Sequence, residues 1–242
     1  MPFAPLRFVP LGLLTMAMLG NGYAADADWP HYGGDLGSTK YSTLDQINAE
    51  NVSQLQIAWQ WESVDNATVV EARERDDFRA VPAGWKATPI VVDGVMYIPT
   101  SFGRIVALNP GSGEPIWIFD TRAWEAGRPA NLGWNVRGVA YWAEGDTKRI
   151  FFATNDSYLW SVDAATGQPD SGFGEGGRID LTACLGRDFE RRDYGVVSPP
   201  LVANGVVVVN SIVNDGPQTR EMPPGHVRAF NPRNGEQVWM FR

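Results

Sequence analysis

Apolar residues along the chain gather in short runs separated by tight-turn residues, a pattern typical of antiparallel β-strands. The stretch "ATPIVVDGVMYIPTSFGRIVAL" contains two β-rich runs broken by Asp93-Gly94, which is a hairpin signal. "RIFFATNDSYLWSVD" has Asn155-Asp156 at its break, and "SPPLVANGVVVVNS" has Asn204-Gly205. These segments predict the same plan of short strands and turns in three successive units.

A helical period is visible in one segment, "LDQINAENVSQLQ", which covers residues 44–56. Thr43 or Asp45 is placed to cap a short helix there. The mixed-charge segment at residues 71–79 is expected to be a solvated loop between two strand units.

One turn motif recurs three times. "ALNPGSGEPIW" at residues 107–117 returns as "AFNPRNGEQVW" at 229–239 and, more faintly, as "SVDAATGQPDS" at 161–171. The Asn or Asp of each copy suits a side-chain cap of the turn, and the following glycine supplies a positive φ. Trp117 and Trp239 follow that glycine by four residues, whereas the middle copy has Ser171 in this place.

Four-stranded units that repeat in this way predict an all-β fold, a β-propeller built from blades. About three blades fit within this chain. One tryptophan per blade, packed against the next blade, would bury a large flat ring and set the blade spacing. We therefore interpret Trp117 and Trp239 as core residues rather than as residues of a binding site.

Composition narrows the classes of function. The 242 residues carry a formal net charge of −8, and 44% of them are apolar. A packed globular chain is expected, and nucleic acid is not expected as a partner because it would require a basic surface. Cys184 is the single cysteine, so an internal disulfide and a dithiol redox mechanism are excluded.

The first residues have the features of an export signal. Arg7 precedes an apolar run at residues 8–19, and small residues follow it. Residues 1–25 are predicted to be a signal peptide, leaving residues 26–242 as a partial propeller domain in the periplasm. An uncleaved N-terminal anchor is the alternative, although the run is shorter than the roughly 20 residues that span a bilayer.

With these repeats, the chain resembles the quinoprotein dehydrogenases, which depend on pyrroloquinoline quinone (PQQ). Both strong turn copies match that family's motif, Ala-x-Asp/Asn-x-x-x-Gly-x-x-x-Trp. The opening segment at residues 28–61 and "NVRGVAYW" at residues 135–142 are more specific matches. The resemblance implies an eight-bladed ring with PQQ on its axis, whose last blade is completed by an N-terminal strand ending at Trp59 or Trp61.

On this interpretation the chain is an N-terminal portion of a longer enzyme. Three blades cannot close a ring, so we expect the isolated chain to be inactive and either marginally stable, prone to aggregate or a partial record of the protein. The resemblance places the catalytic aspartate, with further metal and quinone contacts, beyond Arg242. No catalytic residue is assigned within the chain.

The resemblance assigns four residues to PQQ. Arg137, in the pair Arg137-Gly138, matches an arginine that holds a PQQ carboxylate, and a guanidinium suits such a bidentate contact. A structural arginine that bridges two blades is the alternative. Thr154 and Ser198 match hydroxyl positions near the cofactor, or else are ordinary strand residues. Lys86 stands where many members carry a glutamate that bonds PQQ, and it is able to pair with a carboxylate.

A metal ligand is expected near residue 215. Asp215 matches the ligand position best and Asn214 second, for calcium or another divalent ion that polarises the quinone. An ordinary Asn-Asp-Gly turn is the alternative. The adjacent cysteines of the alcohol-oxidising members are missing before Arg137. This absence favours the branch that acts on glucose, quinate and related polyols.

The resemblance implies oxidation of a sugar, polyol or alcohol, with PQQ as hydride acceptor and a membrane quinone or a cytochrome as electron acceptor. A peripheral position at the membrane is compatible with such an acceptor. The alternative is a non-enzymatic propeller that acts as an envelope scaffold, but a scaffold has no use for Arg137-Gly138. "GFGEGG" at residues 172–177 fits a dinucleotide-loop pattern without the strand and helix that such a loop needs.

Overall fold

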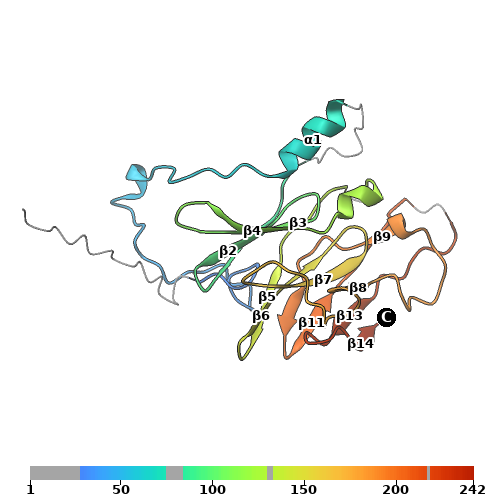
Figure 1. The fold of residues 1–242 in the computed structure, drawn as a ribbon. Helices are drawn as coiled ribbons and strands as arrows, with labels where there is room; N and C mark the ends of the chain where they lie inside the picture. The colour runs from blue at the N-terminus through green and yellow to red at the C-terminus, as the bar shows by residue number, and fades with distance from the viewer. Residues whose placement is uncertain (1–27, 75–83, 130–132, 217–218) are drawn as a thin grey trace, which may run out of the picture.

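The computed structural model describes residues 28–74, 84–129, 133–216 and 219–242. The expected signal peptide lies outside the described residues and stays a prediction. Three four-stranded antiparallel sheets follow one another along the described chain, and Figure 1 shows them side by side. No helix in this part of the chain is long and apolar enough to span a membrane.

Each sheet consists of short strands that pair with their neighbours along the chain. The first contains β1 (Ile90–Val92), β2 (Val95–Pro99), β3 (Arg104–Leu108) and β4 (Pro115–Asp120). The second contains β5 (Ala140–Glu144), β6 (Thr147–Ala153), β7 (Tyr158–Asp163) and β8 (Arg178–Asp180). The third contains β10 (Leu201–Ala203), β11 (Val206–Val209), β13 (Val227–Phe230) and β14 (Gln237–Phe241). These meanders confirm the three predicted blades.

A separate two-stranded sheet pairs β9 (Tyr194–Gly195), which follows the second sheet in the chain, with β12 (Ile212–Val213), which lies between β11 and β13 in the sequence. The described helices are α1 (Asp65–Glu74) and the 3-10 helices η2 (Val52–Gln54), η4 (Ala123–Ala126) and η5 (Arg191–Asp193).

Two of the predicted hairpin turns are confirmed. Asp93 and Gly94 join β1 to β2 with φ of 51° and 74°, and Asn204 and Gly205 join β10 to β11 with φ of 49° and 74°. Positive φ at both central residues gives a turn whose twist matches that of the flanking strands. Asn155-Asp156 was placed one strand too early, because it joins β6 to β7 rather than the first two strands of its sheet.

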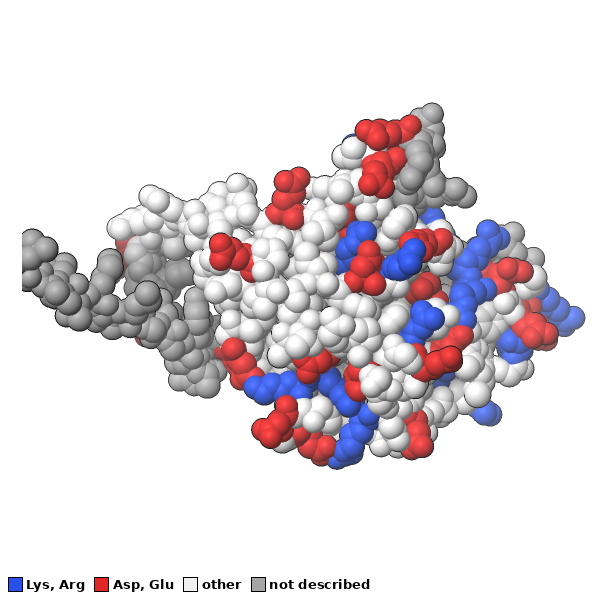
Figure 2. Space-filling model, viewed as in Figure 1, with Lys and Arg blue, Asp and Glu red and all other residues white. Residues whose placement is uncertain are grey.

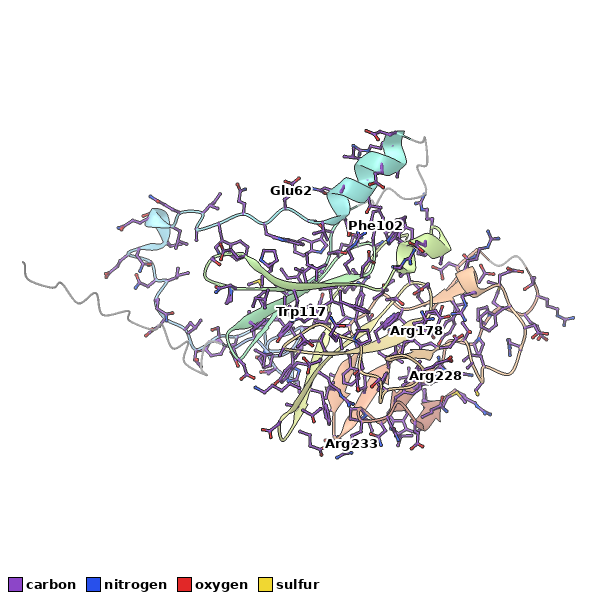
Figure 3. The ribbon with its side chains drawn as sticks, viewed as in Figure 1. Glu62, Phe102, Trp117, Arg178, Arg228 and Arg233 are labelled. Atoms are coloured by element: carbon purple, nitrogen blue, oxygen red, sulfur yellow. The ribbon has the colours of Figure 1, made fainter. Side chains whose placement is uncertain are left out.

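The repeated turn and its tryptophan connect one sheet to the next. A Cβ on Gly113 would lie 2.5 Å from the Trp59 ring, and the Trp59 indole donates to Pro110 O at 3.0 Å. Trp117 lies in the same way against Gly167, because a Cβ there would lie 2.5 Å from its ring. Trp59 and Trp117 therefore each dock on a glycine turn of the following sheet, which confirms the core role of Trp117, the ring labelled in Figure 3.

The middle copy of the motif was aligned incorrectly at its end. Ser171 does not occupy the tryptophan place, because a loop separates the turn at Gly167 from β8. Ile179 of β8 occupies it instead, since a Cβ on Gly235 would lie 2.9 Å from Ile179 Cδ1. Trp239, the corresponding ring of the third sheet, is 42% exposed, so the described structure does not bear out its predicted core role.

Strand β6 shows why the middle sheet has apolar residues on both faces. Phe151 is fully buried in a cluster with residues of the third sheet, including Val207 and Phe230. Ile150 and Phe152 are buried in a second cluster with residues of the first sheet. Successive side chains of a strand point to opposite faces, so a sheet packed on both sides requires a continuous apolar run.

The helix expectations were wrong. Residues 44–56 contain only the one-turn η2, and their side chains are almost all exposed, so no buried face holds a longer helix there. The helix forms at α1 instead, which stands out from the sheets in Figure 1. Its buried residues are Asp65, Thr68 and Ala72, and this polar face gives no apolar period that a sequence search would detect.

Candidate functional site

The segments that lead into the first strand of each sheet meet around Gly138. Thr88 N, before β1, donates to Arg137 O at 2.9 Å. A Cβ on Gly138 would lie 3.2 Å from Pro199 Cβ and 3.4 Å from Tyr32 Cδ2. A side chain next to Arg137 would require these neighbours to shift by a few tenths of an ångström, so glycine suits the close approach of the three chain segments. The structure thus gathers the segments that carry Lys86, Arg137 and Ser198.

Two cations lie in the segments just before the first strands, which are called strand entrances below: Lys86 before β1 and Arg137 before β5. No carboxylate pairs with either of them within the described residues. The side chains of Arg137 and Lys86 are exposed. Within the described residues, neither forms an ion pair or a side-chain hydrogen bond. A guanidinium and an ammonium held close to neighbouring segments of backbone can bind a ligand with several carboxylates. The residues present therefore fit the carboxylates of PQQ at this point.

Ser198 adds a hydroxyl at the third entrance. It is half-buried, and Asn210 Nδ2 donates to its Oγ at 3.4 Å. Because Ser198 accepts in this contact, its own proton remains available to a ligand. The assignment of Ser198 to PQQ stays a prediction, and this hydrogen bond is compatible with it.

Thr154 is less available than the sequence alone implies. It is fully buried at the end of β6. Its hydroxyl contacts Asp156 Oδ1 and lies 3.2 Å from Tyr158 O, so its one proton is used inside the β6–β7 turn. A contact with a PQQ carboxylate would require this hydroxyl to change its acceptor. The assignment stays a prediction, and the turn gives it no support.

Asn214 and Asp215 lie after β12 with different surroundings. Asn214 Nδ2 donates to Asp193 Oδ1 at 2.9 Å, and Asn214 Oδ1 accepts from Gly216 N at 3.0 Å. Asn214 therefore acts as a turn residue, which is the alternative to its assignment as a metal ligand. Asp215 is exposed. Within the described chain, no group of three or more His, Cys, Asp or Glu residues is arranged to hold a metal ion.

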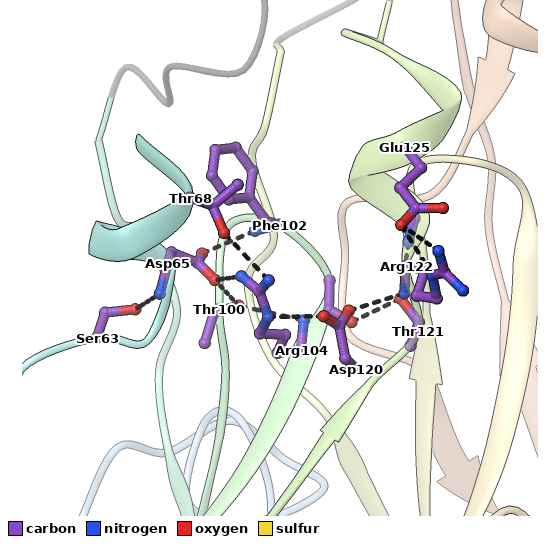
Figure 4. Close-up of polar contacts among 12 residues, drawn as sticks. Ser63, Asp65, Thr68, Thr100, Phe102, Arg104, Asp120, Thr121, Arg122 and Glu125 are labelled. Atoms are coloured by element: carbon purple, nitrogen blue, oxygen red, sulfur yellow. Dashed lines mark hydrogen bonds and ion pairs between the residues drawn. The ribbon is translucent and has the colours of Figure 1, made fainter. Parts of the chain in front are cut away.

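Sequence reasoning missed a buried ionic cluster beside the first sheet, which Figure 4 shows. Asp65, at the start of α1, accepts from Arg104 Nη1 at 2.6 Å, from Thr100 Oγ1 at 2.9 Å and from Phe102 N at 2.9 Å. Arg104 Nε in turn donates to Asp120 Oδ2 at 2.9 Å. In the sequence, these three charged residues resemble ordinary surface charges. The reason is that Arg104 lies 39 positions from Asp65 and 16 positions from Asp120.

Three comparisons with known proteins place this architecture. Quinoprotein glucose dehydrogenase A of Acinetobacter calcoaceticus is 28% identical over 90% of this chain, and the glycerol dehydrogenase large subunit of Gluconobacter oxydans is 31% identical over 96%. The quinohemoprotein alcohol dehydrogenase of Comamonas testosteroni matches 91% of this chain and 28% of its own, with a TM-score of 0.67 at 26% identity.

The glucose and glycerol enzymes agree with the branch expected from the missing cysteines. The chain spans 28% and 31% of the length of these two curated relatives. A family model for the β-propeller domain of PQQ-type glucose, ethanol and alcohol dehydrogenases matches residues 29–242. The chain therefore belongs to this family of quinoprotein dehydrogenase propellers.

Proposed function

We propose that the whole protein is a PQQ-dependent dehydrogenase that oxidises the CH–OH group of a sugar, polyol or alcohol. The observation that carries the proposal is the pair of exposed, unpaired cations, Arg137 and Lys86, at neighbouring strand entrances. Family membership supports the cofactor, and the relatives support the substrate class. When bound, PQQ supplies the quinone that accepts two electrons from the substrate.

The chain's own residues have a binding and orienting role in this proposal. Arg137 would hold one carboxylate in a fixed plane, and Lys86 would hold a second carboxylate as a point charge. Ser198 would donate its hydroxyl proton to the cofactor from the third sheet. Gly138 keeps the segment before β5 close to Pro199, which brings the chain segments of Arg137 and Ser198 together.

Calcium has less support from the described residues. Asp215 offers one exposed carboxylate, and Asn214 is already bonded to Asp193. These residues do not form a metal site by themselves, so any calcium bound at Asp215 requires ligands from elsewhere in the protein. No step of the proposed function is assigned to the metal.

A periplasmic location and an electron acceptor complete the proposal. The N-terminal apolar run followed by small residues supports export. A membrane quinone or a cytochrome would take the electrons from the reduced cofactor. An envelope scaffold is the competing function, and the similarity to dehydrogenases does not favour it.

The decisive experiment adds PQQ and calcium to the full-length protein and measures dye reduction with a panel of sugars, polyols and alcohols. We expect bound PQQ and activity with at least one polyhydroxylated substrate. Failure to bind PQQ would refute the proposal. Binding without any turnover would leave the cofactor role and remove the assigned reaction class.

Replacing Arg137 with alanine in the full-length protein should weaken PQQ binding by about 2 kcal/mol, which is roughly thirtyfold in Kd. The reason is that one carboxylate of the ligand loses its charged partner. Equilibrium dialysis with detection of PQQ absorbance measures the change. Arg220→Ala is the matched control, because Arg220 is also exposed. Equal affinities for the two variants would show that Arg137 is structural.

A further inference from the structure

A second concave site lies between the first two sheets, apart from the strand entrances. It has a volume of about 810 Å³, within the range of small-molecule pockets. Its walls come from the end of β4 and the turn after it, from the start of β7, and from the turn into β8. None of the six residues assigned to PQQ or the metal lines it.

Aromatic rings form one wall of this pocket. Phe119 and Trp160 meet edge to face with their ring centroids 5.2 Å apart, and Tyr158 lies on the same strand as Trp160. The Arg178 guanidinium (Figure 3) stands 4.2 Å from the Tyr158 ring centroid and 5.1 Å from that of Trp160. The Arg178 guanidinium, stacked on the ring of the half-buried Tyr158, therefore adds a flat polar group to this wall.

Charged side chains surround the pocket, and most of them already have partners. Seven lining residues are charged: Asp120, Arg122, Glu125, Asp156, Glu175, Arg178 and Asp180. Asp120 is paired with Arg104 at 2.9 Å, Arg122 with Glu125 at 2.7 Å, and Asp180 with Arg191. On the face shown in Figure 2, acidic and basic side chains lie interspersed rather than in a patch of one sign.

This lining excludes several ligand classes. Five carboxylates against two lining arginines disfavour an anion. The ring faces that would attract an organic cation are covered by Arg178, which repels a second cation. No three acidic or histidine side chains in the described chain are arranged for a metal. An apolar ligand would leave the charged groups unhydrated.

Two carboxylates of the pocket have no ion-pair partner within the described residues. Asp156 accepts from the Thr154 hydroxyl, and burial raises the pKa of its carboxyl above the ordinary value. Glu175 is exposed, and its side chain makes no hydrogen bond in the described part of the chain. These carboxylates and the edges of the Arg178 guanidinium suit groups that donate and accept at once.

We propose that this pocket binds a neutral polyhydroxylated ligand, such as a sugar or sugar alcohol, at a site separate from the one around Arg137. Hydroxyl groups would bond to the dispersed carboxylates and to the edges of the Arg178 guanidinium, whose plane is held by its stacking on the Tyr158 ring. The inference rests on the pocket alone and does not require the proposed dehydrogenase function.

Saturation-transfer NMR on the purified full-length protein, without PQQ, tests the proposal with four probes: D-glucose, D-sorbitol, tetramethylammonium and acetate. We expect transfer to the first two at millimolar affinity. Tyr158→Ala should weaken that binding roughly tenfold, because Arg178 loses the ring on which its guanidinium is stacked. Tyr158→Phe should retain it, since the Tyr158 hydroxyl has no hydrogen bond within the described residues, and this variant also shows that the position tolerates replacement.

Glu175→Gln tests the polar wall without disturbing the core, because Glu175 is exposed. Binding of D-glucose should weaken roughly fivefold, since a neutral acceptor forms weaker hydrogen bonds than a carboxylate. Glu114→Gln, an exposed glutamate outside the pocket, is the matched control and should leave the affinity unchanged.

Three results would overturn the inference: no binding of either polyol, preferential binding of tetramethylammonium or acetate, or equal affinities in the wild type, Tyr158→Ala and Glu175→Gln. The Arg137→Ala variant separates the two proposals. Sugar binding that survives in Arg137→Ala but is lost in Tyr158→Ala assigns the ligand to this pocket. The reverse pattern assigns the sugar to the site around Arg137 and overturns the inference.

Discussion

The Asp65→Ala variant is expected to lose about 3–5 kcal/mol of the free energy of unfolding. Asp65 is 4% exposed, and its carboxylate accepts three hydrogen bonds that tie α1 to the first sheet. Its removal leaves the Arg104 guanidinium, whose side chain is 11% exposed, with only the partly exposed Asp120 as counter-charge. Urea denaturation followed by circular dichroism measures the loss.

Asp45→Ala is the control for this prediction, because Asp45 is an exposed aspartate in the N-terminal arm. Its unfolding free energy should stay within about 0.5 kcal/mol of the wild type. Asp120→Ala should fall between the two variants, since Asp120 is a more exposed partner of the same arginine. If Asp65→Ala and Asp45→Ala unfold alike, the ionic cluster does not hold α1 to the sheet.

Phe152→Ala is expected to destabilise the chain by about 3–5 kcal/mol, through the lost apolar burial and the cavity left behind. Phe152 is 1% exposed and packs between the first two sheets. Neighbouring strands constrain its position from both sides, so the site cannot collapse to fill the space. Urea denaturation reports the change, and the slope of unfolding free energy against urea should stay the same.

Phe241→Ala is the matched control, since Phe241 is 72% exposed on β14. Its unfolding free energy should change by less than about 1 kcal/mol. A loss below that limit for Phe152→Ala as well would show that the contact between the first two sheets is loosely packed.

Much of the fold could be predicted from the sequence, because local chemistry determines it. Asp93-Gly94 and Asn204-Gly205 form tight hairpins for reasons confined to the turn itself. The register of the repeated motif was less secure. Ile179 replaces a tryptophan only because a loop after Gly167 brings β8 back to the same place, and such a return has no local signal.

The candidate site was predictable in part. The position of Arg137 between strands was predicted from a short segment, and the structure brings together the segments that precede β1, β5 and β10. The use of the Thr154 hydroxyl within its turn depends on how Asp156 lies in three dimensions. The pocket between the first two sheets was not predicted, since its walls come from four separate segments.

The contact of Trp117 or Ile179 with the glycine turn of the next sheet joins two different surfaces: the last strand of one sheet and the glycine turn of the next. Such a head-to-tail contact has no twofold axis, so it propagates in one direction and closes only when its rotations add up to a full circle. The size of a ring built in this way is therefore encoded in the angle of one contact.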